Sequence, residues 1–429
     1  MLKRQESVST PTRAILEERW LRIIPTAFAM YTIAYIDRTN VSMALPSMVR
    51  ELHMTPTQAG DAVGIFFWGY LLLQIPGGYA AERWSAKRFV SVLLVAWGIC
   101  SVGCGLVHTA RQFWVMRLLL GVSEGGVWPA TLVLLAHWFP RAERARANGY
   151  WMLCQPASVI LASPLSGWIL GHWDWRVLLI AEGALPFAWL VAWWWFIADH
   201  PRQAGWISAG ERDHLESTLR RESAELEPVS PEPFLRTLVR PRVLLMAIVY
   251  FLICSGGYGY LFWLPSALKS VSKASDLRVA FLFMVPYLLT GVGMVLNSRH
   301  SDRTRERRLH VAAPLAMAGV FFLAAVFASK QPLVSFIFLC LVGPGIYGEL
   351  GPFWAIPGEV FPRAVAGSAI GLINAIGGLG GYFGPLVVGY LNQRTGNFLY
   401  AFGVLGVALL MSSALTLLFR IAPALAESV

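Results

Sequence analysis

Six ionisable residues lie inside long apolar stretches of the sequence: Asp37, Arg38, Arg117, Glu124, Glu182 and Glu349. In a helix that crosses a membrane such a residue costs at least about 2.5 kcal/mol, so it usually has a function. A guanidinium group can hold a carboxylate through two parallel hydrogen bonds. A carboxyl group near a guanidinium can change protonation when an anion arrives or the local solvation changes. These residue types therefore indicate anion binding together with proton exchange.

The spacing places these groups in pairs. Arg117 and Glu124 are seven residues apart, nearly two helical turns, so they share one helix face about 10 Å apart along the axis. Asp37 and Arg38 are adjacent. Ion pairs that only fix helix packing are the alternative, but four deep charges exceed what packing requires. Glu349 stays open between a second proton site and a residue that lines the outer exit.

The composition excludes an ordinary water-soluble protein. Of 429 residues, 56% are hydrophobic and 14% are charged, whereas soluble domains carry roughly 25% charged residues. The net charge of +10 does not indicate nucleic-acid binding. Most Lys and Arg residues fall on the expected cytoplasmic side of the membrane, which is the distribution that the positive-inside rule describes for membrane proteins.

No residue pattern indicates an enzyme, a metal site or a cofactor. The five cysteines lie singly in apolar runs and indicate buried thiols, with no disulfide or metal framework. No cluster of His and Asp at helical spacing is present for a membrane-embedded enzyme. The basic, polar N-terminus lacks a small-residue cleavage site, so we expect no cleaved signal peptide.

Twelve apolar runs are long enough to cross a bilayer as helices, since roughly 20 apolar residues are needed. They lie near 21–46, 58–81, 87–108, 112–138, 147–171, 176–198, 243–267, 279–298, 309–329, 333–357, 364–391 and 397–420. The long polar stretch 199–242 separates the sixth run from the seventh, and its basic residues place it and both termini on the cytoplasmic side.

The two sets of six resemble each other. "HWFPRAERARANG" (137–149) is echoed by "EVFPRAVAGSAIG" (359–371), and "GYAAERWSAKR" (78–88) corresponds to "SRHSDRTRERR" (298–308). Internal duplication around a central linker is typical of transporters with a site between two bundles. We therefore predict an all-α membrane protein of two pseudo-symmetric six-helix bundles, with residues 1–198 and 243–429 as the bundles and 199–242 as a cytoplasmic linker.

At this point the chain resembles the major facilitator superfamily, and within it the anion:cation symporters. The acid–Arg–basic loop at 78–88 is similar to the superfamily's signature, with Glu82 where Asp is common and Ser85 where Gly is common. The symporter resemblance covers nearly the whole chain, most specifically "YIDRTN" (35–40), "QIPGG" (74–78), "RLLLGVSEGG" (117–126) and "PFWAIPGEVFP" (352–362). The segment "ADHPRQAGWISAGER" (198–212) is like the tartrate and phthalate branch.

The resemblance implies a role for each deep residue. Arg38 and Arg117 match arginines that bind the substrate carboxylate, and Asp37 and Glu124 match acids that carry protons. Uncharged polar and aromatic groups would contact the rest of the substrate, and by the same match these are Tyr35, Tyr70, Gln155, Trp354 and Asn374. Glu182 fits the tartrate and phthalate branch and is expected near the outer interface. Glu82–Arg83 and Asp302–Arg303 are expected to act as conformational latches.

The favoured function is import of a small organic anion together with protons. Helix seven offers Tyr258 and Tyr260 but no third arginine, which favours a monoanion with a hydroxylated or aromatic body. Sugar acids such as galactonate or a hexuronate come first, and tartrate, phthalate or hydroxyphenylacetate second. The alternative is a proton-driven exporter of the same fold, which "ASPLSGWILG" (162–171) disfavours because it lacks the exporters' Gly-Pro-Gly-Gly bend. We expect a monomer in the cell inner membrane.

Overall fold

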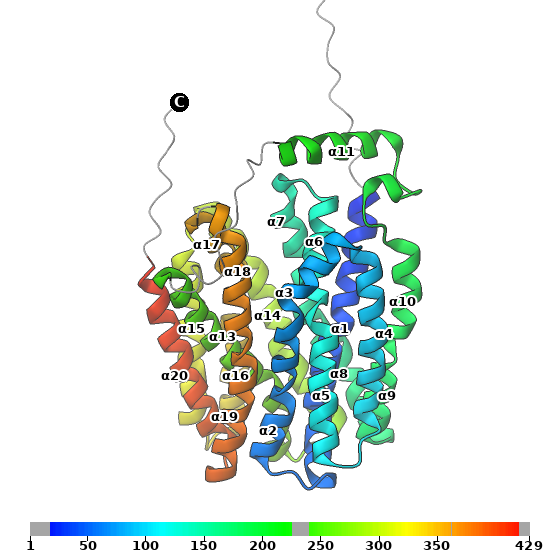
Figure 1. The fold of residues 1–429 in the computed structure, drawn as a ribbon. Helices are drawn as coiled ribbons and strands as arrows, with labels where there is room; N and C mark the ends of the chain where they lie inside the picture. The colour runs from blue at the N-terminus through cyan, green and yellow to red at the C-terminus, as the bar shows by residue number, and fades with distance from the viewer. Residues whose placement is uncertain (1–17, 225–239, 362, 420–429) are drawn as a thin grey trace, which may run out of the picture.

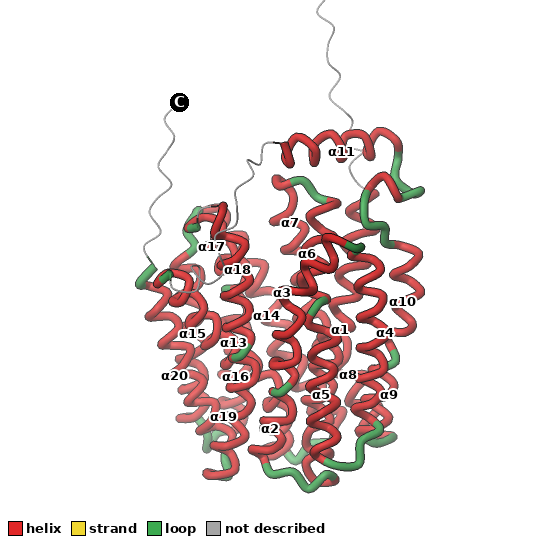
Figure 2. The backbone as a smooth tube through the Cα atoms, in the orientation of Figure 1, coloured by secondary structure: helices red, strands yellow, loops and turns green. Residues whose placement is uncertain are grey.

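The computed structural model describes residues 18–224, 240–361 and 363–419, and every regular element in these ranges is a helix (Figure 1). Figure 2 shows the same helices joined by short loops. In these ranges ten helices are long and apolar enough to cross a membrane, or eleven when the bent pair Pro56–Gln74 and Pro76–Arg83 is taken as one span. The 34-residue α1 (Glu18–Glu51) lies alongside them and is the remaining expected span. Its polar residues, including Asp37, Arg38 and Asn40, lower its hydropathy.

The first group of helices covers the expected N-terminal bundle, and most of its spans are two helices in series. They are α1, α2 (Pro56–Gly64) with α3 (Phe66–Arg83), α4 (Ala86–Gly105), α5 (Ala110–Gly125) with α6 (Val127–Trp138), α7 (Arg141–Met152) with α8 (Cys154–His172), and α9 (Trp175–Gly183) with α10 (Leu185–Phe196). Thr55 and Thr109 begin α2 and α5 with capping boxes completed by Gln58 and Gln112.

The second group repeats this order after the linker. It comprises α13 (Pro241–Ser272), α14 (Asp276–Thr304), α15 (Arg308–Phe327), α16 (Pro332–Gly348) with α17 (Leu350–Val360), α18 (Arg363–Gly378) with α19 (Gly380–Thr395), and α20 (Phe398–Leu417). Within the predicted linker lie a short 3₁₀ turn at Pro201–Gln203 and α11 (Ala209–Ala224). The rest of the linker, 225–239, lies outside the described residues, so the linker boundaries stay predictions.

Close helix packing in the N-terminal group depends on glycine. A Cβ atom on Gly121 of α5 would lie 1.9 Å from the backbone oxygen of Phe66 on α3, a distance that only a glycine permits. The two helices therefore approach until their backbones touch. This contact sets the position of Arg117, one turn earlier on α5, next to the Phe66 ring.

The two groups of helices are sealed against each other on the face remote from α11. The most extensive contacts between them join α2 to α19 and α8 to α14. Thr57 Oγ1 donates to Gln393 Oε1 at 2.6 Å, and Tyr382 Oη donates to Asp61 Oδ1 at 2.8 Å. We call the surface formed by Thr57, Asp61, Tyr382 and Gln393 the sealed face. Figure 1 shows α2 and the lower part of α19 at the end of the molecule opposite α11.

Candidate functional site

A small cavity of about 40 Å³ lies between the two groups of helices. Its lining is dominated by aromatic rings and amides, with one charged group, Arg38. The N-terminal group contributes Tyr31, Tyr35, Arg38, Phe67, Tyr70, Trp128, Met152 and Gln155, and the C-terminal group contributes Tyr250, Cys254, Tyr258, Leu350, Trp354, Asn374 and Gly378. A cavity at the junction of two bundles, apolar with a few convergent polar groups, is the usual form of a small-molecule site.

Arg38 is the charged centre of this cavity. Its guanidinium group lies 4.7 Å from the Tyr35 ring centre and 5.2 Å from that of Tyr70, so two aromatic faces hold it in place. Arg38 Nη2 donates to Glu124 Oε2 at 3.0 Å, and both residues are buried. Within the described residues, Arg38 Nε and Glu124 Oε1 have no hydrogen-bond partner. The two charges of the pair thus balance each other, while Arg38 Nε can still donate a hydrogen bond and Glu124 Oε1 can still accept one.

Asp37 points away from the cavity, towards α4. It accepts a hydrogen bond from Ser101 Oγ at 2.7 Å and a short one from Trp97 Nε1, and Asn40 Nδ2 lies 3.3 Å away. Sequence analysis did not single out Trp97 or Ser101. Asp37 is thus held by hydrogen-bond donors of α1 and α4, whereas Glu124 faces Arg38. The two acids lie in different surroundings although both were expected to carry protons.

Arg117 does not line the cavity in this structure. It is fully buried, with Nη2 donating to the Val63 carbonyl at 3.3 Å and the guanidinium 4.9 Å from the centre of the Phe66 ring. Arg38 lies 5.1 Å from the same ring. The two arginines therefore share Phe66 as a neighbour, but the expected pair of guanidinium groups facing one cavity is absent in this conformation. Within the described part of the chain, Arg117 Nε and Nη1 have no partner.

The other residues expected to contact substrate all line the cavity: Tyr35, Tyr70, Gln155, Trp354 and Asn374. Asn374 Nδ2 donates to Gln74 Oε1 at 2.9 Å, and Gln74 Nε2 donates to the Gly125 carbonyl at 2.9 Å. This chain of amides joins the C-terminal group of helices to the break between α5 and α6, next to Glu124. The roles of these residues in binding stay predictions.

Sequence reasoning missed four of the rings on the cavity wall: Tyr31, Phe67, Trp128 and Tyr250. Tyr31 could have been found, because it lies one turn before Tyr35 on the same helix face, and its hydroxyl lies 3.2 Å from that of Tyr70. Of the two tyrosines noted in helix seven, Tyr258 lines the cavity. Tyr260 instead donates to the Leu339 carbonyl and packs inside the C-terminal group.

Two further buried glutamates lie at helix junctions. Glu182, next to the α9–α10 junction, accepts a hydrogen bond from Ser166 Oγ at 2.8 Å and is 2% exposed, so it is buried among the helices of the N-terminal group. Its expected position near the outer interface stays a prediction. Glu349 separates α16 from α17 and is fully buried. Both Glu349 oxygens lack a partner in the described ranges.

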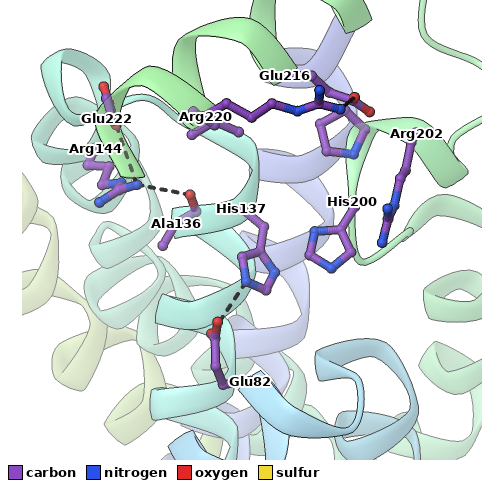
Figure 3. Close-up of a pocket in the computed structure, with 11 residues that line it drawn as sticks. Glu82, Ala136, His137, Arg144, His200, Arg202, Glu216, Arg220 and Glu222 are labelled. Atoms are coloured by element: carbon purple, nitrogen blue, oxygen red, sulfur yellow. Dashed lines mark hydrogen bonds and ion pairs between the residues drawn. The ribbon is translucent and has the colours of Figure 1, made fainter. Parts of the chain in front are cut away.

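A larger pocket of about 360 Å³ lies under α11 (Figure 3). His137 Nε2 lies 3.3 Å from Glu82 there, and the His137 ring lies 4.4 Å from that of His200. Burial lowers the pKa of His200, and the neighbouring His137 lowers it further. Among the described residues, the ion-pair partner of Glu82 is thus His137 and not Arg83. Likewise Asp302 pairs with Arg307 at 2.5 Å, so the expected Glu82–Arg83 and Asp302–Arg303 pairs are not the ones observed. This pocket lies outside the bundle junction.

No group of three or more His, Cys, Asp or Glu side chains that could hold a metal ion occurs in the ranges that the structure describes. All five cysteines are free thiols.

Comparison with known proteins gives a consistent result. The family model described as "Major Facilitator Superfamily" matches residues 27–385. A protein of Agrobacterium vitis named "Putative tartrate transporter" is 34% identical over 94% of this chain and 91% of its own length. A "Quinolone resistance transporter" of Acinetobacter baumannii is 30% identical over 92% of each chain. The crystal structure of a D-xylose-proton symporter superposes with a TM-score of 0.76 at 14% identity, covering 95% of this chain and 98% of that one.

Proposed function

We propose that this chain, which belongs to the Major Facilitator Superfamily of membrane transporters, imports a small organic anion together with protons by alternating access. The observation that carries the proposal is the Arg38–Glu124 salt bridge, buried at the edge of an aromatic cavity between the two bundles. A cation held by a single acid in a low-dielectric site can exchange that acid for another anion. The name of the tartrate-transporter relative supports a carboxylate as that anion.

Competition for Arg38 provides the coupling. When Glu124 takes up a proton it loses its charge, and the guanidinium group becomes available to the substrate carboxylate. When the substrate leaves and Glu124 loses its proton, the Arg38–Glu124 salt bridge forms again. Leaving the buried guanidinium without any anion is strongly unfavourable, so proton uptake and substrate binding favour each other. Asp37 is proposed to assist by exchanging a proton at the α1–α4 contact.

The cavity lining supports a compact monoanion with a hydroxylated or aromatic body. Arg38 is the one charged residue on the lining, which gives a single carboxylate site. The tyrosine hydroxyls, together with the amides of Gln155 and Asn374, offer both donors and acceptors for hydroxyl groups. Sugar acids such as galactonate or a hexuronate are the preferred substrates, with tartrate, phthalate and hydroxyphenylacetate next.

We further propose that the α11 face is cytoplasmic, that both termini are cytoplasmic, and that the protein acts as a monomer in the cell inner membrane. The basic residues of 199–242 support this orientation through the positive-inside rule. The sealed face is then the outer one. Since the 40 Å³ cavity is too small for a sugar acid, the bundles must separate before such a substrate can enter.

The test is uptake into proteoliposomes with an imposed pH gradient, over a panel of galactonate, glucuronate, tartrate, phthalate and hydroxyphenylacetate. Arg38→Lys keeps the positive charge but loses the planar guanidinium group, which can bind both oxygens of a carboxylate. The affinity for the active acid should fall tenfold or more, because one charge-assisted hydrogen bond contributes about 1.5 kcal/mol. Arg111→Lys, at the exposed start of α5, is the matched control. Normal affinity in Arg38→Lys, or no uptake of any acid by the wild type, would contradict the proposal.

Arg117 is tested separately, because it lies behind Phe66 in this structure. We propose that it reaches the substrate in another conformation, so Arg117→Ala should abolish uptake of the active acid. Retained uptake in this variant would remove Arg117 from the site and leave Arg38 as its guanidinium group.

Export is the second candidate function, favoured by the relative named as a quinolone resistance transporter and by the aromatic cavity wall. An exporter would lower the cellular accumulation of norfloxacin when it is expressed in a drug-sensitive host, and Arg38→Ala would restore that accumulation. An importer of organic acids would leave norfloxacin accumulation unchanged in the same assay.

A further inference from the structure

Glu349 is a buried carboxyl group that the proposed cycle does not use. It is 0% exposed, and neither of its oxygens has a hydrogen-bond partner among the described residues. No ion pair involving it occurs in those residues either. An ionised carboxylate in a dry interior needs donors or a counter-charge. In this conformation Glu349 is therefore a neutral acid, which means that it holds a proton.

Its place in the fold corresponds to that of Glu124. Glu124 lies at the end of α5, just before the junction with α6, and Glu349 is the residue that separates α16 from α17. The repeated segments "HWFPRA" (137–142) and "EVFPRA" (359–364) follow these two junctions. When the segments are aligned, the two glutamates differ by less than one helical turn. Each half of the molecule thus has one buried glutamate near the break in its fourth span.

On one side, Glu349 adjoins the central cavity. The next residue, Leu350, lines the cavity, and so does Trp354 one turn further along α17. Tyr250 and Cys254 of α13 also line it and interact electrostatically with Glu349. Those two groups are a neutral hydroxyl and a neutral thiol, so they supply no counter-charge to Glu349.

On the other side, a hydrogen-bonded link leads from the Glu349 junction to a cluster of titratable groups near the α11 face. Asn297 Nδ2 donates to the Gly348 carbonyl at 2.9 Å and to the His310 carbonyl at 2.8 Å, so one amide joins the Glu349 junction to His310 on α15. His310 Nε2 lies 2.6 Å from His300 Nδ1, and His310 Nδ1 lies 2.9 Å from Glu306 Oε2.

Glu306 is suited to this cluster because it stays ionised. Burial raises its pKa, but hydrogen bonds from the backbone N–H groups of Leu309 and His310 and from the His310 ring outweigh burial, and the net pKa lies below its usual value. An ionised carboxylate at the loop between α14 and α15 stabilises a proton held on the His310 ring, from which the proton can pass to water.

We propose that Glu349 is a second proton-carrying group, which is loaded from the central cavity and releases its proton on the α11 side, where His310 and His300 accept it next to the ionised Glu306. This inference rests on the proposed proton-coupled function. One more proton per cycle means one more positive charge moved with each substrate anion. The net charge moved per acid therefore distinguishes a cycle that uses Glu349 from one that does not.

The experiment measures the charge moved per molecule of acid in proteoliposomes, from the membrane potential at which net flux of the acid stops. The probe is tartrate, or the acid that the uptake panel selects if tartrate is not transported. Glu349→Gln imitates the protonated acid and should retain exchange of labelled for unlabelled acid while moving one charge fewer per acid. Glu182→Gln, another buried glutamate next to a helix junction, is the matched control and should leave the ratio unchanged.

An unchanged charge ratio in Glu349→Gln with retained exchange overturns the inference while the proposed function stands. No transport of any acid by the wild type means that the proposed function itself has failed. If Glu349→Gln does not fold, His310→Gln gives an independent test. It should slow pH-driven uptake several-fold while exchange without a pH gradient keeps its rate, and equal rates in both assays overturn the inference.

Discussion

At the scale of single residues, the central feature is one cation shared by two competing anions. Among the described residues, Arg38 has Glu124 as its one acidic partner, at 3.0 Å, and both are buried. The rings of Tyr35 and Tyr70 fix the guanidinium from its faces, so it cannot move far to find a new partner. A substrate carboxylate must therefore come to Arg38, and Glu124 must give way.

The first prediction concerns Glu124→Gln. The glutamine removes the acidic competitor for Arg38 and cannot take up or release a proton. Counterflow of labelled against unlabelled acid should persist, whereas accumulation driven by a pH gradient should fall at least tenfold. Both are measured in proteoliposomes with the acid found active in the panel. Normal accumulation driven by the pH gradient would show that another group carries the coupling proton.

The residue types could be read from the sequence, but their orientations could not. Deep charges are rare in apolar spans, so Arg38 and Glu124 stood out without any structure. Which face each side chain takes depends on neighbours distant in the sequence. Arg117 turns towards Val63 and Phe66 because Gly121 brings α5 against α3, and that contact joins two separate spans. Tyr250 and Trp128 reach the cavity in the same way, through packing between spans.

At the scale of helices, the seal between α2 and α19 depends on a glycine. A Cβ atom on Gly60 would lie 2.4 Å from the Pro385 carbonyl oxygen, which is backbone and cannot move aside alone. Gly60→Ala should therefore weaken the sealed face and shift the protein towards the conformation open on that side. A thiol reagent that cannot cross the membrane should label a cysteine placed at Tyr382 several-fold faster in this variant.

Gly171→Ala is the control for this prediction. Gly171 lies near the end of α8, and a Cβ atom there would meet nothing within 4 Å. Labelling of the cysteine at position 382 should match the parent protein in that variant. Equal labelling rates in Gly60→Ala and Gly171→Ala would show that the α2–α19 contact does not limit opening.

Helix positions were the most predictable part of the fold. Length and apolarity located the spans, because a bilayer demands about 20 apolar residues per helix. The junctions that divide six of these spans into two helices were not predicted. Hydropathy does not locate them, since junction residues such as Gly126 and Ala184 are as apolar as their surroundings. The local backbone geometry is set by packing against neighbouring helices.

At the scale of the whole molecule, the linker is anchored to the N-terminal bundle by a buried cation. Arg19 of α1 donates to Glu143 at 2.6 Å and to Glu211 of α11 at 2.9 Å, and it is 1% exposed. Arg19→Ala leaves two carboxylates without their cation, which should cost about 3–5 kcal/mol. We predict that α11 detaches, measured as faster trypsin cleavage after Arg212, Arg220 or Arg221.

Arg220 supplies the control for this anchor. It pairs with Glu216 on the surface of α11 and is mostly exposed, so its loss should cost at most about 0.5 kcal/mol. Arg220→Ala should leave cleavage after the remaining arginines at the parent rate. Equal cleavage rates in Arg19→Ala and the parent would mean that α11 is held by other contacts.

Alternating access requires the sealed face to open in every cycle, and the contact between Thr57 and Gln393 lies across it. In a background without the five native cysteines, Thr57→Cys with Gln393→Cys should form a disulfide on oxidation. The covalent bond holds the two bundles together on this face, so uptake should stop, and reduction should restore it. Each single variant should be insensitive to oxidation.

Binding provides the second half of the same prediction. The disulfide joins the bundles on the sealed face and does not obstruct the α11 face. The active acid should therefore still bind to the oxidised protein, with an affinity within a few-fold of that of the reduced protein. Equilibrium dialysis in detergent measures both affinities. Continued uptake by the cross-linked protein would exclude alternating access at this face. It would mean that the acid passes through the molecule without separation of the two bundles. Loss of binding together with uptake would mean instead that the acid reaches Arg38 from the sealed side alone.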